Sequence, residues 1–128
     1  MKANEFRIGN WIYIPQTKTN EQIGSIEENG RFTTKNYKSS YSSIECLEPI
    51  PLTKKWLLKF GFERSMSWTY VIELQGNLKL VYYLGEKGWS IGFKAYSDFS
   101  NLEYVHQLQN LYFALTGEEL KIKENETI

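Results

Sequence analysis

Three consecutive segments of the chain alternate apolar with polar residues, and this alternation constrains the fold more than any other feature of the sequence. The apolar positions are Trp68, Tyr70, Ile72 and Leu74, then Leu78, Leu80, Tyr82 and Leu84, then Trp89, Ile91, Phe93 and Ala95. Because the side chains of a strand point alternately to its two faces, each segment predicts a strand with one apolar face. Together they predict a three-stranded antiparallel meander whose apolar face needs a cover.

The phases of the apolar residues also predict how these strands pair, since partners across two strands must share a face. A three-residue loop joins the first two strands in this prediction, and a four-residue loop joins the second and third. The predicted pairs are Tyr70 with Tyr82, Ile72 with Leu80 and Glu73 with Lys79 in the first hairpin, and Tyr82 with Ile91 in the second.

A helix within the stretch Tyr104–Leu120, near the C-terminal end of the sequence, is the predicted cover. Ser100 and Glu103 have the spacing of a capping box, and Gly117 is placed to end the helix. At the helical period its apolar residues span an arc of about 200°, wider than one sheet face requires. We therefore expect the helix to touch a second element as well, and this wide apolar surface makes a homo-oligomer a candidate assembly.

The segment before Glu48-Pro49-Ile50-Pro51 contains four short stretches of β character: Trp11–Ile14, Gln22–Glu27, Arg31–Thr34 and Ser42–Leu47. Asn29-Gly30 is the strongest turn signal among them, since both residues tolerate the positive φ angles of a tight hairpin. Several short strands without a helical period predict a small curled sheet or SH3-like barrel.

After the two prolines, Thr53 is predicted to cap a short helix that runs through Phe60 and is ended by Gly61. Lys54 and Lys55 stand in its first turn, where the helix dipole disfavours positive charge. The whole pattern predicts an α+β fold. A barrel-like subdomain covers residues 1–48. A second subdomain, residues 49–122, holds the short helix, the meander and a long covering C-terminal helix, and residues 123–128 form a frayed tail.

Composition excludes several classes of protein. Fifteen basic and fifteen acidic residues cancel, so no global field attracts nucleic acid or an anionic membrane. The single cysteine, Cys46, excludes a disulfide-stapled scaffold and indicates a reducing cytoplasm. No stretch approaches the roughly twenty apolar residues of a membrane-spanning helix. We expect a cytoplasmic protein without a membrane partner.

Residues with catalytic chemistry are scarce. His106, the single histidine, falls at the polar edge of the predicted helix, where no second ligand stands three or four residues away. We expect a structural or solvent-facing role and a small effect of its removal. Cys46 lacks any nucleophile signature, and no glycine loop has phosphate-binding spacing. The sequence predicts no catalytic residue, no metal site and no cofactor, and therefore a protein that is not an enzyme.

One stretch, Gly30–Tyr41, has the composition of a binding loop. Basic and aromatic residues interleave there without an acid: Arg31, Phe32, Lys35, Tyr37, Lys38 and Tyr41. Basic side chains contact phosphates and aromatic rings stack on bases, so the loop is a candidate site for single-stranded nucleic acid. A protein partner and a merely solvated hairpin explain the same residues. A further alternative is an accessory enzyme whose carboxylate and tyrosine site lies between the two halves.

Three motifs carry a resemblance to a known family. KANEFRIGNWIYI, EPIPLTKKWLLKFGF and YVHQLQNLYFALTGEEL resemble a family of short uncharacterised proteins from gut bacteria and their phages or prophages. The resemblance spans nearly the whole chain, although acidic residues are usual in that family where Lys54 and Lys55 stand. It implies a phage-associated or mobile-element protein and carries over no functional residues. The function predicted is a non-enzymatic interaction module with an unidentified protein partner.

Overall fold

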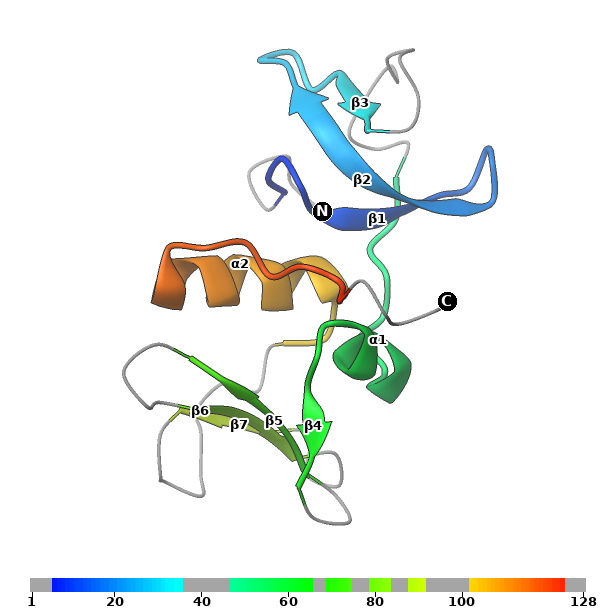
Figure 1. Ribbon diagram of the computed structural model, residues 1–128. Coiled ribbons are helices and arrows are strands. Elements are labelled where there is room, and N and C mark those ends of the chain that lie inside the picture. Colours follow the sequence, from blue (N-terminus) through cyan, green and yellow to red (C-terminus); the bar gives the residue numbers. More distant parts are fainter. Residues whose placement is uncertain are drawn as a thin grey trace. The chain divides into compact units, whose positions relative to one another are not determined.

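The computed structural model describes residues 6–35, 47–65, 69–74, 79–83, 88–91 and 102–123, which form seven strands and two helices (Figure 1). They divide into two compact units. Unit 1 comprises Met1–Pro51 with Glu103–Leu111, and unit 2 comprises Leu52–Leu102 with Tyr112–Ile128. The helix α2 (Val105–Thr116) contributes its first part to unit 1 and its last part to unit 2. The mixed α+β class is as predicted.

Unit 1 is built on an antiparallel sheet of β1 (Trp11–Ile14), β2 (Thr19–Ile26) and β3 (Phe32–Thr34) in that order. These strands confirm three of the four predicted β segments, with β2 starting earlier than expected. The fourth, Ser42–Leu47, lies outside the described residues except for Leu47. Apolar alternation turns one face of the sheet inward, and the core consists of Phe6, Ile12, Ile14, Ile23, Phe32 and Leu47.

Two glycines shape this sheet. Gly30 has a φ of 88°, and the Gly30 N–H donates to the Glu27 carbonyl at 3.0 Å, so a turn lies where it was predicted, although Asn29 does not take a positive φ. Gly24 lies where the pairing of β2 with β3 shifts register, between Ile23 and Ser25. A Cβ on Gly24 would lie 3.3 Å from the backbone nitrogen of Lys35. Such a bulge bends and twists a strand, and β2 is visibly curved (Figure 1).

The free side of β1 is also paired at one point. The Tyr13 N–H donates to the Glu48 carbonyl at 2.9 Å, and the Glu48 N–H returns a bond to the Tyr13 carbonyl at 2.8 Å. β1 is therefore flanked by β2 and by this bridge. The described strands form a curved open sheet and no closed barrel.

In unit 2, helix α1 (Lys54–Lys59) has both predicted caps. The Thr53 side chain accepts a hydrogen bond from the Trp56 N–H at 3.5 Å. At the other end, the Phe62 N–H donates to the Leu57 carbonyl and Gly61, with a φ of 95°, takes the left-handed conformation. This is a Schellman motif, which satisfies carbonyls that the helix itself leaves open.

The predicted meander is present in unit 2 as β5 (Thr69–Glu73), β6 (Lys79–Tyr83) and β7 (Gly88–Ile91), with an additional edge strand, β4 (Glu63–Arg64), beside β5. The first hairpin has the predicted register: Tyr70 pairs with Tyr82, Ile72 with Leu80 and Glu73 with Lys79. Its buried face carries Tyr70, Leu80 and Tyr82.

The predicted register of the second hairpin is wrong. Tyr82 pairs with Trp89 and Leu80 with Ile91, whereas Tyr82 had been expected opposite Ile91. The two registers differ by two residues, and a shift of two returns every side chain to the same face. The apolar pattern therefore cannot distinguish them, and only the turn geometry can.

Helix α2 differs from the prediction in length and in its start. It has 12 residues and begins at Val105, so the long C-terminal helix is not confirmed. Ser100 of the predicted capping box lies outside the described residues. The Gln107 side chain turns back and accepts from the Glu103 and Tyr104 N–H groups at 2.9 and 3.1 Å. Gln107 stands three residues after Tyr104, so these two residues have the spacing of a capping box. Gly117, with a φ of 75°, ends the helix as predicted.

Candidate functional site

The predicted binding loop of unit 1 is described only in part. Arg31 and Lys35 are exposed, as phosphate contacts require, whereas Phe32 is 0% exposed and belongs to the core. Phe32 therefore cannot stack on a base in this fold, because its ring already packs inside the sheet. Tyr37, Lys38 and Tyr41 lie outside the described residues.

The prediction that His106 lies at a polar helix edge is wrong. Its side chain is 0% exposed, and its ring centroid lies 4.5 Å from that of Phe6 and 6.0 Å from that of Tyr104. The buried residues of α2 are Val105, His106, Leu108 and Gln109. The buried face thus includes two polar residues that the apolar arc had left out, because each has a specific place in unit 1.

Gln109 of this buried face holds the loop before β1. Its Oε1 atom accepts from the Trp11 N–H at 2.8 Å, and its Nε2 atom donates to the Gly9 carbonyl at 3.0 Å. The same carbonyl accepts from Gln22 Nε2 at 3.0 Å. A buried side-chain amide satisfied at both ends fixes the backbone that it bridges.

Asn110, the next residue of the helix, binds two side chains of the same loop. Its Oδ1 atom accepts from Arg7 Nη1 at 2.6 Å and from Asn10 Nδ2 at 3.0 Å. Asn10 is itself 0% exposed, and its Oδ1 atom accepts from the Arg7 N–H. The polar residues of the RIGN motif are thus engaged inside unit 1, and we interpret Gln109 and Asn110 as a structural clamp that holds this loop to α2.

Unit 2 contains a surface groove with a volume of about 490 Å³. It is lined by residues 63–65 at β4, residues 71–73 of β5, Lys79 of β6, Gly61 and Lys123. Glu63 pairs with Val71 and Glu73 with Lys79, so these four side chains share the sheet face opposite the buried Tyr70. The groove therefore lies on the outer face of the sheet, at the end where β4 begins.

Gly61 and Lys123 together form one wall of this groove. The Lys123 N–H donates to the Lys59 carbonyl at 3.0 Å, which holds the segment after α2 against the end of α1. A Cβ on Gly61 would clash with Cε of Lys123 and would lie 3.1 Å from its Nζ atom. The Lys123 side chain thus crosses Gly61 where a side chain would otherwise stand, and it brings a positive charge to the groove.

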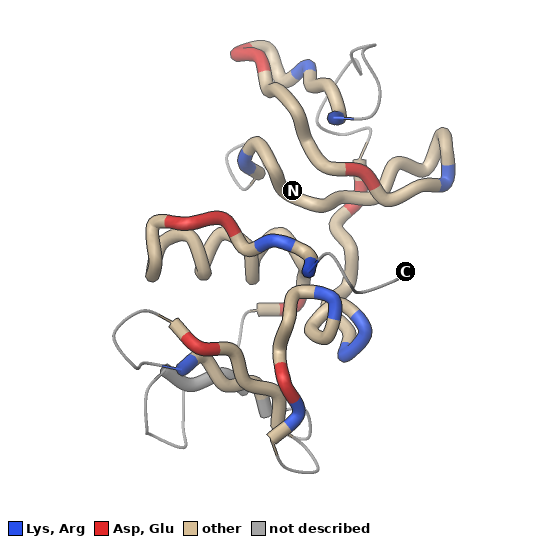
Figure 2. The backbone as a smooth tube through the Cα atoms, viewed as in Figure 1, with Lys and Arg blue, Asp and Glu red and all other residues tan. Residues whose placement is uncertain are grey.

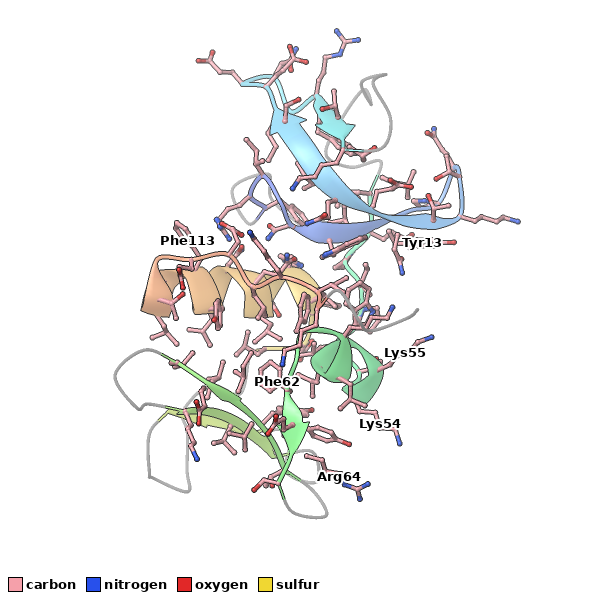
Figure 3. The ribbon with its side chains drawn as sticks, viewed as in Figure 1. Tyr13, Lys54, Lys55, Phe62, Arg64 and Phe113 are labelled. Carbon is pink, nitrogen blue, oxygen red and sulfur yellow. The ribbon has the colours of Figure 1, made fainter. Side chains whose placement is uncertain are left out.

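The groove is dense in exposed charge. Glu63, Arg64, Glu73, Lys79 and Lys123 are all exposed, and Figure 3 shows Arg64 extending away from β4. None of Glu63, Glu73, Lys79 and Lys123 forms an ion pair with another residue that the structure describes. These charges are solvated in the isolated protein and are available to a ligand with complementary groups.

Further lysines extend this charged surface over α1, as the blue segments of Figure 2 show. Lys59 is 8% exposed, and its Nζ atom lies 4.4 Å from the centroid of the Trp56 ring. Burial lowers the pKa of Lys59, and the like charge of Lys55 lowers it further. Lys55 therefore lies close enough to Lys59 to repel its charge, and the Lys123 backbone is hydrogen-bonded to that of Lys59.

The lowered pKa of Lys59 predicts a pH dependence of stability. The unfolded chain holds the Lys59 proton up to about its ordinary pKa of 10.5, whereas the folded protein releases it earlier. Stability should therefore rise with pH between the lowered pKa and 10.5, because the unfolded state binds more protons in this window. In a Lys59→Met variant this rise should be missing, so the difference in unfolding free energy between the two proteins should change with pH.

Urea unfolding of both proteins at several pH values up to 10.5 measures this difference. Tyr82, whose pKa burial raises, titrates in both proteins and cancels. Lys55→Met should weaken the pH dependence, and Lys54→Met, which removes an exposed neighbour, is the matched control. A difference that stays constant over the whole range would contradict the assignment.

Two other kinds of site are not found in the part of the chain that the structure describes. It holds no group of three or more His, Cys, Asp or Glu side chains placed to bind a metal ion. Within the same residues, no helix has the length and apolar character needed to cross a membrane.

Compared with models of known protein families, with curated proteins and with solved structures, the chain matched none of them.

Sequence reasoning missed both the clamp and the groove. A polar Gln109 between the apolar Leu108 and Leu111 was a signal for the clamp, since such a residue inside a packed helix face needs buried partners. The groove had no comparable signal. Its charges come from four separated segments, and only the Schellman turn and the path of residues 120–123 bring Lys123 beside β5.

Proposed function

We propose that the protein is a cytoplasmic, non-enzymatic interaction module that binds a partner protein through the charged groove of unit 2. The observation that supports this best is the groove itself, in which Glu63, Glu73, Lys79 and Lys123 form no ion pair with another described residue. Such groups favour a partner that places opposite charges against them, because electrostatic complementarity fixes the register of binding.

We further propose a supporting role for unit 1. Its bulged β2 and the Tyr13–Glu48 bridge favour the small SH3-like barrel predicted from the sequence. The clamp of Gln109 and Asn110 ties the helix that leads into unit 2 to this sheet. The resemblance of the sequence motifs supports a phage or mobile-element setting, and the partner is then a protein of the host or of the element.

The test is capture of partners from a lysate of cells that carry the gene, after nuclease treatment. Lys123→Glu reverses the charge that crosses Gly61, and Lys121→Glu makes the same change at an exposed position that does not line the groove. We expect one partner to be retained by the unmodified protein and by Lys121→Glu, and to be lost by Lys123→Glu.

Two results would contradict the proposal. One is a partner that Lys123→Glu retains as well as the unmodified protein does, since binding would then use another surface. The other is capture that disappears with nuclease and is weakened by Arg31→Ala, since that result assigns nucleic-acid binding to the loop of unit 1.

A further inference from the structure

The edge of β5 is paired over only part of its length. β4 pairs with β5 through Glu63 with Val71 and Arg64 with Tyr70. If this pairing continued for two more residues beyond Glu63, Phe62 would lie opposite Ile72 and Gly61 would lie opposite Glu73. Phe62 and Gly61 instead form the Schellman end of α1, so no described strand pairs with Ile72–Glu73 on that side.

The backbone at this open edge points the right way to bind another strand. The Ser65 N–H donates to the Thr69 carbonyl at 3.0 Å. In an antiparallel ladder every second residue turns its N–H and C=O to the same neighbour, so Val71 and Glu73 face the β4 side like Thr69. Glu73 lines the groove, and the ladder turns both of its backbone groups toward that side. Such edges take up extended peptides as additional strands.

The charges beside the edge indicate which peptide would fit. Lys123 stands over Gly61 and lines the groove together with Glu73 and Lys79. A strand that continued from β4 past Gly61 would pass beneath the Lys123 ammonium group. An acidic side chain on the outer face of that strand would therefore meet Lys123, with Lys79 lining the same groove.

We propose that an extended acidic segment of a partner protein adds to β5 at Ile72–Glu73 and that one of its carboxylates binds Lys123. This rests on the proposed function, since it names the ligand of the same groove. An extended peptide is favoured over nucleic acid because its backbone repeats N–H and C=O groups at the spacing of a neighbouring strand. The added strand would lie beside Ile72–Glu73, in the position that Gly61 and Phe62 would occupy if β4 began two residues earlier.

The experiment is an amide NMR titration of the full chain with a capped hexapeptide of alternating glutamate and valine. In an extended strand all its carboxylates lie on one face. We expect the Glu73 and Lys123 amide signals to move on binding. Lys123→Glu should weaken binding about tenfold, and Lys121→Glu should leave it unchanged. The same peptide N-methylated at alternate amides, and a lysine–valine counterpart, should not bind.

Three outcomes would overturn the inference: no binding of the glutamate–valine peptide, equal binding of its N-methylated form, or movement of Lys123 without movement of Glu73. Each of them leaves the proposed function standing if partner capture still depends on Lys123. Loss of that dependence would remove the groove as the binding surface, whatever the peptides do.

Discussion

Replacing Phe32 by alanine should destabilise the protein by about 3–5 kcal/mol, the usual cost of deleting a buried aromatic side chain. Phe32 is 0% exposed and belongs to a core of six side chains. In so small a core no neighbour can fill the space that the ring leaves. Urea unfolding measures the loss.

Arg31→Ala and Lys35→Ala are the matched controls for this prediction. Both side chains are exposed and flank Phe32 in the sequence, so each change should alter stability by no more than about 0.5 kcal/mol. If Phe32→Ala kept full stability and lost binding to single-stranded DNA, the ring would be a binding residue and its place in the core would be wrong.

Leu108→Ala should have the second large effect, with a loss of about 2–5 kcal/mol. The Leu108 side chain is 0% exposed on the helix face that carries Gln109. His106→Ala, a change that the sequence alone predicted to be minor, should also exceed the roughly 0.5 kcal/mol of a surface substitution. The reason is its full burial against Phe6.

Thermal or urea unfolding of both variants tests this pair, with Leu115→Ala as the control because that side chain is 41% exposed in the same helix. A Leu108→Ala variant as stable as Leu115→Ala would contradict the buried face of α2 described above. A His106→Ala variant with unchanged stability would instead support the small effect that was predicted from the sequence.

Local patterns predicted several features that depend on neighbours in the sequence, although not the register of the second hairpin. The caps at Thr53 and Gly61, the turn at Gly30 and the first hairpin register are all fixed by residues within a few positions of one another. Each has a specific physical cause, such as a side-chain acceptor, a positive φ or a shared face. The sequence was sufficient for these.

Features that depend on distant parts of the chain were not predictable in the same way. Periodicity placed His106 at a polar edge because the helical wheel takes no account of Phe6, which packs on it from 100 residues away in the sequence. It gave no reason for a strand at Glu63–Arg64, where both side chains are exposed. The groove likewise depends on how the segment after α2 returns to α1.

The sharing of α2 by both units has a consequence for the order in which the chain can fold during synthesis. Unit 1 is discontinuous, since its last segment, Glu103–Leu111, follows fifty-one residues of unit 2. The Arg7–Asn110 hydrogen bond closes a separation of 103 residues. On the ribosome the first fifty residues therefore emerge without the helix that clamps them, whereas α1 and the β4–β7 sheet can pair as they appear. Contacts of long sequence separation form slowly. Although the chain begins with unit 1, its completion must wait until α2 has emerged.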